Sequence, residues 1–287
     1  MLQKQNKIFK AKNTIHGGKW IKGIFKKIDK ENPLISIITV TLNSQKYLEE
    51  TLKSIFDQKY KNYELIIIDG KSNDKTLKII KKNNNKIDYW ISQKDKGIYD
   101  AFNKGLALAR GQYIGFVNSD DVLTKNSLKY LAHYHRTKKF DFLFGAVKKH
   151  WGILHGYKKW KIKFSWGFYS SHSTGFFISN KAAKKVGKYN LKFKYHADWD
   201  YFYRMIIKKK LVGISSNKNE LFGHFRRGGY SSNIAYDNHV LETIKIRLSN
   251  GQNNFFVLLI TLYKFYKNLH LIKEKKKTFN NILSLTI

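Results

Sequence analysis

The chain has 287 residues, of which 42% are hydrophobic and 15% aromatic, so we expect a globular protein rather than a disordered or fibrous one. It has no cysteine, which excludes disulfides, cysteine nucleophiles and iron–sulfur clusters. The 55 lysines and arginines against 20 aspartates and glutamates give a formal net charge of +35, which favours an anionic partner: a nucleic acid, a membrane surface or a phosphorylated substrate.

The first 32 residues form a basic segment with regularly spaced apolar side chains. They contain nine lysines against two acids, Asp29 and Glu31. Five apolar residues recur at the spacing of one helical face: Trp20, Ile21, Ile24, Phe25 and Ile28. We therefore expect a basic amphipathic arm over residues 1–32, ended by Pro33 and able to lie on an anionic membrane surface.

Apolar runs that alternate with helical patterns follow this arm. Strands are expected at 34–41, 64–69, 88–92 and 113–117, and helices at 48–56, 77–80 and 98–109. Strands that alternate with helices in this way are typical of an α/β fold with a mostly parallel central sheet flanked by helices.

The last part of the chain, residues 237–287, is expected to be a helical extension. Between Phe255 and Leu271, apolar residues recur on one side of a helix: Phe255, Leu258, Leu259, Leu262, Phe265, Tyr266 and Leu269. This side either packs on the core or lies on a membrane surface. No apolar run approaches the roughly 20 residues of a membrane span, and we expect a cytoplasmic protein that is peripheral at the inner face of the plasma membrane.

Polar residues follow three of the expected strands, where ligands bind in open α/β sheets. These segments run from Thr41 to Asn43, from Asp69 to Asp74 and from Asn118 to Asp121. Adjacent carboxylates at Asp120 and Asp121 are costly to bury without a cation, and oxygen ligands alone suit Mg²⁺ or Mn²⁺ shared with a diphosphate. The alternative is that Asp121 caps the following helix.

Two carboxylates are isolated in a strongly basic stretch. Asp198 and Asp200 are the only acids between Phe142 and Asn219. Lysine-rich surroundings favour the ionised form of a carboxylate, which a general base requires. Asp200 is four residues before Arg204, so we expect it to cap a helix or to form an ion pair with Arg204. Asp198 is a candidate base, and the alternative is an ion pair with a neighbouring lysine.

Six segments of the chain resemble glycosyltransferase family 2 in sequence, order and spacing. They are PLISIITVTLN (33–43), IDGKSND (68–74), DKGIYDAFNKGLALARGQYIGFVNSDD (95–121), SHSTGFF (171–177), HADWDYFYR (196–204) and FRRGGYS (225–231). The chain looks most similar to the bacterial branch that builds surface polysaccharide and lipopolysaccharide. The resemblance implies a GT-A fold over 33–236, with a nucleotide-binding half at 33–121 and an acceptor half at 122–236.

The resemblance also implies a reaction and a set of site residues. The reaction is an inverting, metal-dependent transfer of a hexosyl or N-acetylhexosaminyl group from a nucleotide-sugar to a glycan or lipid-linked acceptor. The implied donor contacts are Thr41, Asn43, Asp69, Asp100, Asn103, Asp120, His224, Arg226 and Arg227. Asp120 and Asp121 match the metal-binding DxD-type element, and Asp198 matches the base. His172 and Trp166 are candidates for the acceptor side, although the aromatic residues around Trp166 are equally expected in a packed β-extension.

Two departures from the family pattern affect the choice of nucleotide. Gly70 follows Asp69 where many relatives have a second aspartate, and Leu42 stands where an aromatic residue is common. A uridine nucleotide is favoured, with guanosine and thymidine open. The alternatives are a basic nucleic-acid-binding protein and a nucleotidyltransferase on a similar sheet. A role in nucleic acid binding would leave Asp120, Asp121 and Asp198 unexplained.

Overall fold

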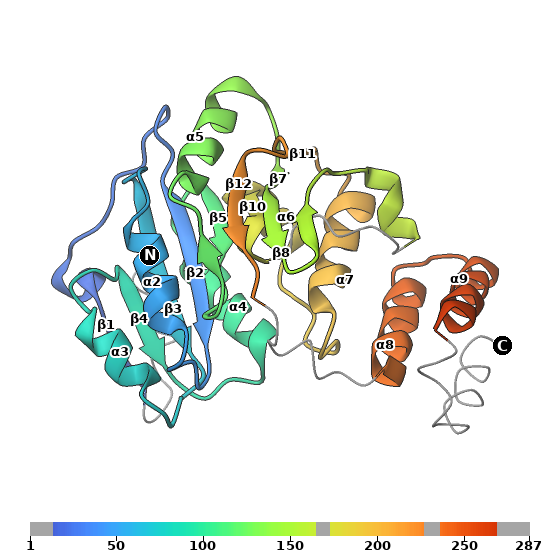
Figure 1. The fold of residues 1–287 in the computed structure, drawn as a ribbon, viewed down its shortest axis with the longest axis horizontal. Coiled ribbons are helices and arrows are strands. Elements are labelled where there is room, and N and C mark those ends of the chain that lie inside the picture. The colour runs from blue at the N-terminus through green and yellow to red at the C-terminus, as the bar shows by residue number, and fades with distance from the viewer. Residues whose placement is uncertain (1–13, 165–172, 227–235, 269–287) are drawn as a thin grey trace.

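The structure is a computed structural model that describes residues 14–164, 173–226 and 236–268. Within these residues, a central sheet has eight strands in the order β1-β4-β3-β2-β5-β10-β7-β11 (Figure 1). Their bounds, in chain order, are β1 (Ile15–Gly17), β2 (Ile35–Thr41), β3 (Tyr63–Asp69), β4 (Tyr89–Ser92), β5 (Tyr113–Phe116), β7 (Phe142–Phe144), β10 (Phe176–Ser179) and β11 (Gly213–Ser215). The predicted Arg227, His172 and Trp166 contacts lie outside the described residues.

The middle of this sheet is parallel and buried on both faces, as the apolar runs predicted. β2 pairs in parallel with β3 and β5, and β3 pairs in parallel with β4. Successive side chains of a strand point to opposite faces. Ile38 and Val40 therefore belong to one apolar core, with Phe102, while Ile37 belongs to a second core, with Leu52.

Helices cover both faces of the sheet, which confirms the expected α/β fold (Figure 1). Their bounds are α2 (Leu48–Phe56), α3 (Thr76–Lys82), α4 (Ile98–Leu108), α5 (Ser127–Thr137), α6 (Asn180–Val186), α7 (Ala197–Tyr203), η4 (Arg204–Lys208), α8 (Tyr236–Ser249) and α9 (Asn254–Lys267), with single turns at η1 (Lys19–Lys22), η2 (Lys159–Lys163) and η3 (Ser173–Gly175). Residues of α4 and α7 contribute to one core, whereas residues of α2, α3 and α5 contribute to the other.

A second, smaller sheet begins directly after the paired aspartates. Among the described residues its strand order is β6-β12-β8-β9. The bounds are β6 (Val122–Leu123), β8 (Ala146–Lys149), β9 (Gly152–Leu154) and β12 (Leu221–His224). Antiparallel pairing places His224 opposite Val122, so the end of β12 lies beside the chain that leaves Asp121.

The N-terminal segment is not the amphipathic helix that its apolar spacing predicted. Instead, β1 pairs antiparallel with β4 at the edge of the central sheet, and η1 is a short 3₁₀ turn. Gly23 ends this turn in a left-handed conformation with φ of 72°, which favours glycine. Trp20 is buried and stacks on Tyr89 with ring centroids 5.2 Å apart. The other four predicted face residues are exposed: Ile21, Ile24, Phe25 and Ile28.

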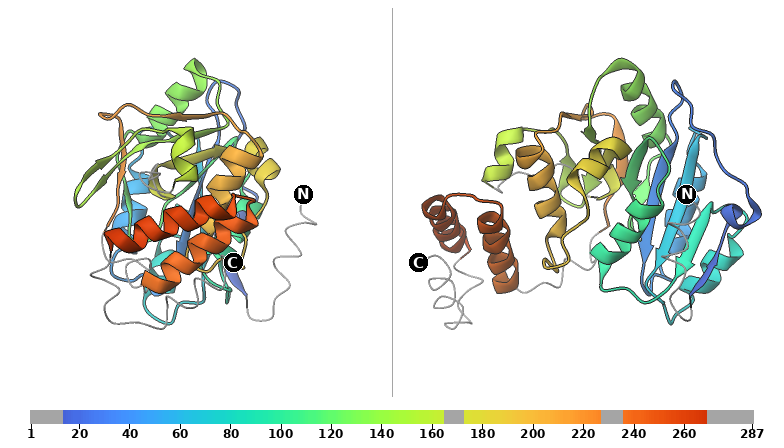
Figure 2. Two further views of the ribbon diagram at one scale, coloured as in Figure 1. Left: turned by 90° about the vertical axis from the view of Figure 1, so that its right-hand side faces the viewer. Right: turned by 180° about the vertical axis from the view of Figure 1, so that it is seen from behind.

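The C-terminal helix exists as predicted, but a different side of it packs. α8 and α9 lie side by side at the end of the molecule farthest from β1 (Figures 1 and 2). The residues that α9 buries are Val257, Ile260, Thr261 and Phe265. Of the described residues on the predicted apolar side, only Phe265 is buried, because apolar residues nearly encircle this helix and tertiary contacts select the side that packs. In the part of the chain that the structure describes, no helix is long and apolar enough to cross a membrane.

Candidate active site

The first two predicted strand ends meet at Asp69. Thr41 and Asp69 are opposite each other in the β2–β3 register, and the Thr41 hydroxyl donates to Asp69 Oδ1 at 3.0 Å. The Ser92 hydroxyl, at the end of β4, donates to Asp69 Oδ2 at 2.6 Å. Ser72 donates its N–H to the same oxygen at 3.1 Å and its hydroxyl to Oδ1. The buried carboxylate of Asp69 therefore fixes three strand ends and the loop after β3.

Asn43 connects the loops that follow β2 and β3. Its φ of 50° is left-handed, a conformation that asparagine tolerates better than most residues. Its Oδ1 accepts the N–H of Asn73 at 3.0 Å, and its own N–H donates to Ser72 Oγ at 2.9 Å. The predicted donor residues Thr41, Asn43 and Asp69 are thus brought together at one edge of the sheet.

Asp95 belongs to this edge, although the sequence analysis did not single it out. It lies just after β4, and a Cβ on Gly70 would come within 2.7 Å of Asp95 Oδ2. The pKa of Asp95 is raised, mainly by burial, with Asp100 and Asp69 adding repulsion. Its position three residues after a strand end was the signal that could have identified it.

Of the two adjacent carboxylates that follow β5, Asp121 is more buried than Asp120. It is fully buried, and burial raises its pKa to about 7, with further repulsion from Asp120. Its Oδ2 accepts the Thr174 hydroxyl at 2.5 Å, and its Oδ1 accepts the N–H of Arg226 at 3.2 Å. Lys149 lowers the pKa of Asp121 but does not compensate for burial. The alternative role as a cap of the next helix is excluded, because Asn126 is the cap of α5.

Arg226 and His224 reach this strand end from β12 and the residues just after it. Arg226 Nε donates to the Asp120 carbonyl at 3.1 Å, and its guanidinium pairs with Glu50 at 2.5 Å. The same guanidinium lies 4.1 Å from the ring centroid of Tyr47. His224 is largely exposed at the end of β12, and the partial burial of its ring, with the charge of Lys148, lowers its pKa.

The donor set suits a cation that is shared with a diphosphate. Among the described residues, no cluster of three or more histidine, cysteine, aspartate and glutamate side chains could enclose a metal. Mg²⁺ commonly binds through one or two carboxylates, water and substrate phosphates. From the described residues, each carboxylate oxygen of Asp121 accepts one hydrogen bond, and such an oxygen can accept two. A divalent cation would also offset the burial of its charge, so Asp120 and Asp121 fit the expected metal.

Asp198 lies at a contact between α7 and α4. It is half-buried in the first turn of α7. Its Oδ1 accepts the N–H of Trp199 at 2.9 Å and lies 3.0 Å from the hydroxyl of Tyr99, which comes from α4 in the first half. Asp200 is buried and pairs with Arg204 at 2.9 Å. This pairing confirms the predicted ion pair and leaves Asp198 as the accessible carboxylate of the two.

Asn103 and Asp100 have different surroundings, although both come from α4. Asn103 is 7% exposed, and its amide donates to the Tyr189 carbonyl at 2.9 Å and accepts the Tyr189 N–H at 2.7 Å. These contacts make Asn103 a structural link between α4 and Tyr189, and its role as a nucleotide contact stays a prediction. Asp100 is half-buried, accepts the N–H of Lys96 and lies 3.3 Å from Lys104 Nζ.

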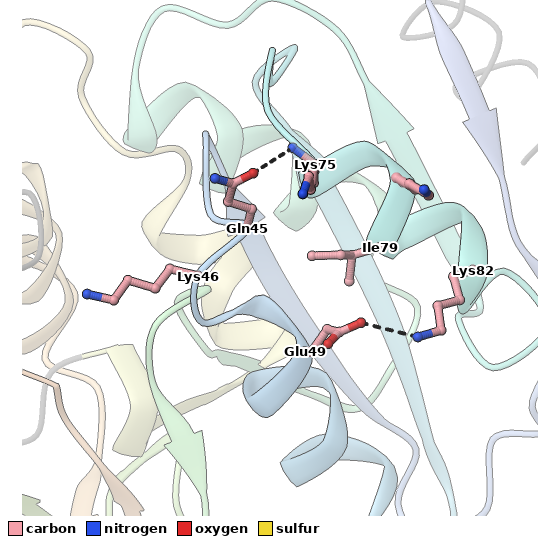
Figure 3. A pocket seen from close by; sticks show the side chains of 7 residues that line it. Gln45, Lys46, Glu49, Lys75, Ile79 and Lys82 are labelled. Atoms are coloured by element: carbon pink, nitrogen blue, oxygen red, sulfur yellow. Dashed lines mark hydrogen bonds and ion pairs between the residues drawn. The ribbon is translucent and has the colours of Figure 1, made fainter.

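A basic hollow on the surface lies near the loops after β2 and β3, which we call the donor loops because the resemblance implies donor contacts there. Figure 3 shows it between the loop after β2, α2 and α3, with the Lys82–Glu49 ion pair at 3.4 Å on one side. Its lining is Gln45, Lys46, Glu49, Lys75, Lys78, Ile79 and Lys82. None of the predicted site residues lines this hollow, and flexible surface lysines alone do not define a binding site.

Several known glycosyltransferases are similar to this chain in sequence. An uncharacterized glycosyltransferase of Methanocaldococcus jannaschii, MJ1057, is 31% identical over 61% of this chain and 66% of its own length. The putative teichuronic acid biosynthesis glycosyltransferase TuaG of Bacillus subtilis is 36% identical over 34% of this chain and 40% of its own. A third relative, from Methanococcus voltae, is 29% identical over 86% of this chain and 64% of its own length. Its name is dolichyl N-acetyl-alpha-D-glucosaminyl phosphate 3-beta-D-2,3-diacetamido-2,3-dideoxy-beta-D-glucuronosyltransferase. The chain spans less than two thirds of the length of each of these relatives.

Solved structures share the fold at low sequence identity. S. aureus TarS 1-349 in complex with UDP-GlcNAc superposes with a TM-score of 0.63 at 18% identity, covering 85% of this chain and 76% of that chain. The mannosyltransferase PcManGT from Pyrobaculum calidifontis, in complex with GDP-Man and Mn²⁺, gives a TM-score of 0.59 at 12% identity, covering 86% and 74%. The model of glycosyl transferase family 2 matches residues 36–211, which is more than half of the sequence. The chain therefore belongs to glycosyl transferase family 2.

Proposed function

We propose that the chain is a metal-dependent, inverting glycosyltransferase that moves a hexosyl or N-acetylhexosaminyl group from a nucleotide-sugar to a glycan or lipid-linked acceptor. One observation carries the proposal most directly. The contact between Tyr99 and Asp198 brings a half-buried carboxylate of the second half against α4, the helix that starts near the donor loops. A base at this junction can face both the acceptor and the donor.

The roles of the residues follow from their positions. Asp198 takes the proton of the acceptor hydroxyl as its oxygen bonds to the anomeric carbon, and the bond from that carbon to the diphosphate oxygen breaks on the opposite side. This single displacement inverts the configuration. Asp120 and Asp121 would hold a divalent cation, which would supply positive charge against the diphosphate leaving group. Arg226 and His224 face the same group, whereas Thr41, Asn43, Asp69 and Asp100, with Asp95 added, form the nucleoside side.

A uridine diphosphate sugar is the donor that we favour. The UDP-GlcNAc complex of TarS supports this choice through the shared fold, and the GDP-Man complex of PcManGT keeps a guanosine donor as the alternative. The name of TuaG supports a role in the synthesis of a cell-envelope polysaccharide, and the dolichyl phosphate in the name of the Methanococcus relative supports a lipid-linked acceptor.

Asp198→Asn tests the reaction. A set of UDP-, GDP- and dTDP-sugars is first screened for release of the nucleoside diphosphate. Asp198→Asn should then abolish transfer while calorimetry shows unchanged UDP affinity, because a base acts mainly in the transition state. Asp57→Asn, which alters an exposed i,i+4 pair with Lys53, is the matched control. If UDP affinity collapses with transfer in Asp198→Asn, Asp198 is a binding or structural residue.

We also propose that the protein is peripheral on an anionic membrane, through the outward side of α9. Four apolar residues at spacings of three and four make one stripe, each between 46% and 76% exposed: Phe255, Leu259, Leu262 and Tyr266. Within α9 the charged residues are Lys264 and Lys267, and burial lowers the pKa of Lys264 to about 8. The helix therefore turns its apolar stripe to solvent and one of its lysines toward the protein.

A basic rim beside this stripe favours a lipid surface as its partner. Phe256 of α9 packs against Phe164 with centroids 5.2 Å apart, and Phe164 packs against Trp160, which is exposed. The segment around Trp160 carries exposed lysines at 158, 159 and 163. An apolar stripe beside lysines matches the acyl and headgroup layers of an anionic bilayer.

Vesicle binding tests the membrane proposal. Binding to vesicles of phosphatidylcholine with phosphatidylglycerol should weaken as salt rises, and a Phe255→Ser/Tyr266→Ser double variant should lose most of it. Trp151→Ser, which changes another exposed aromatic residue, on the β8–β9 hairpin, should bind as wild type does. Equal binding to neutral vesicles, or a concentration-dependent dimer without vesicle binding, would overturn the proposal.

A further inference from the structure

Glu242, a carboxylate on α8, fixes the backbone that leads into the proposed base. Glu242 is buried, and its Oε1 accepts the N–H of Lys194 at 2.5 Å. Its Oε2 accepts the N–H groups of Tyr195 and His196, both at 2.7 Å. Three consecutive backbone N–H groups thus converge on one carboxylate. Hydrogen bonds to an ionised acceptor are shorter and stronger than those between neutral groups, so this contact holds residues 194–196 firmly.

Two histidines complete the contact between α8 and this loop. His196 Nδ1 lies 3.1 Å from Glu242 Oε2, and His196 Nε2 lies 2.5 Å from Nδ1 of His239 on α8. Burial, followed by the neighbouring His196, lowers the pKa of His239 to about 4, which leaves that ring neutral at pH 7. Burial opposes ionisation of Glu242, but the hydrogen bonds from His196 and from the backbone outweigh it and lower the pKa of Glu242.

The same loop determines where Asp198 lies. His196 is the residue before the first turn of α7, and Asp198 is the second residue of that helix. From the opposite side, the Tyr99 hydroxyl lies 2.9 Å from the Tyr195 carbonyl as well as near Asp198. The segment from 194 to 198 is therefore held by Glu242 on α8 and by Tyr99 on α4.

We propose that Glu242 is a positioning residue for the transfer reaction, acting through residues 194–196 on Asp198. The inference rests on the proposed function, which makes Asp198 the base. Glu242 lies beyond the residues 36–211 that the family model matches. The C-terminal extension of this chain is thereby part of the machinery that orients the base, in addition to its membrane surface.

The first test is Glu242→Ala in the full chain. A catalytic group that is misplaced by about 1 Å can lower the rate on the order of 100-fold. If the loss of Glu242 shifts Asp198, kcat should therefore fall by about 10- to 100-fold. UDP affinity and the KM for the nucleotide-sugar should change less than about twofold, because the backbone groups that Glu242 bonds belong to residues 194–196 and a base contributes mainly to the transition state. Formate or acetate, which can occupy the vacated carboxylate position, should restore part of kcat.

Asn250→Ala is the matched control. Asn250 follows α8 and donates to Asp200 Oδ1 at 2.9 Å, so this variant removes another contact between the extension and α7 without freeing residues 194–196. Its kcat should stay within about twofold of wild type, since it leaves the position of Asp198 unchanged. Equal losses in Asn250→Ala and Glu242→Ala, with no rescue by formate, would mean that general docking of α8 matters and would overturn the inference.

Two further comparisons separate the possible failures. If Glu242→Ala does not fold, Glu242→Gln keeps the size of the side chain but presents an NH₂ group to the backbone N–H groups, and the same loss of kcat is expected. Wild-type kcat in Glu242→Ala, together with an inactive Asp198→Asn, would overturn only this inference. An active Asp198→Asn would instead overturn the proposed function.

Discussion

Asn103→Ala distinguishes a structural asparagine from a nucleotide contact. In the structure, the amide of Asn103 bonds both the N–H and the C=O of Tyr189, at 2.7 and 2.9 Å. Both residues are buried, so the substitution leaves two backbone groups without these partners. An unpaired buried group costs about 1–3 kcal/mol, and the expected loss in free energy of unfolding is therefore about 2–6 kcal/mol. Such a loss is a large part of the 5–15 kcal/mol that is typical of a domain.

The assay measures stability and nucleotide affinity on the same samples. Urea unfolding, followed by fluorescence and circular dichroism, gives the free energy of unfolding, and calorimetry on folded protein gives UDP affinity. Asn103→Ala should be destabilised while its UDP affinity changes less than about twofold. The control is Asn83→Ala. Asn83 directly follows α3, and its amide donates to the Ile79 carbonyl at 3.0 Å. This carbonyl is only partly buried, so its loss of a partner should cost less than about 1 kcal/mol. Wild-type stability with weakened UDP binding would refute the reasoning.

Three further variants follow from the same contacts. Asp121→Asn should lose turnover in Mg²⁺ or Mn²⁺. The variant should stay folded, because an amide of equal size can keep the Thr174 and Arg226 contacts. Undiminished activity of the wild-type protein in excess chelator would contradict the metal role. Lys264→Met should stabilise the protein by up to about 3 kcal/mol at pH 7, because the folded-state pKa of about 8 lies below the unfolded value. This gain should shrink as pH rises from about 8 to 10.5, and urea unfolding at pH 7 and pH 10 checks the sign; a gain independent of pH would contradict it. Gly115→Ala should destabilise by more than 1 kcal/mol, roughly an overpacking effect, since its Cβ would lie 2.3 Å from the Phe177 ring; an unchanged thermal midpoint would contradict this.

The sequence predicted the central sheet because its signals are local. The apolar run before Asn43 and the helical spacing after it are short-range patterns, and parallel strands place their carboxyl ends along one edge. Thr41 and Asp69 could therefore be predicted to meet, and their hydrogen bond at 3.0 Å confirms it. The pairing of Asp200 with Arg204 was predictable for the same reason, because four residues are about one helical turn.

Tertiary structure decided which neighbour each of the other polar groups has. Asn103 turned to Tyr189, 86 residues away, and Asp121 to Thr174, 53 residues away. Neither partner has a spacing that a sequence pattern encodes, because these contacts depend on how separate helices and strands pack. For α9, apolar residues nearly encircle the helix, so spacing alone could not choose the buried side. Docking against α8 chose it, because burial is a property of the whole packed chain rather than of any one segment.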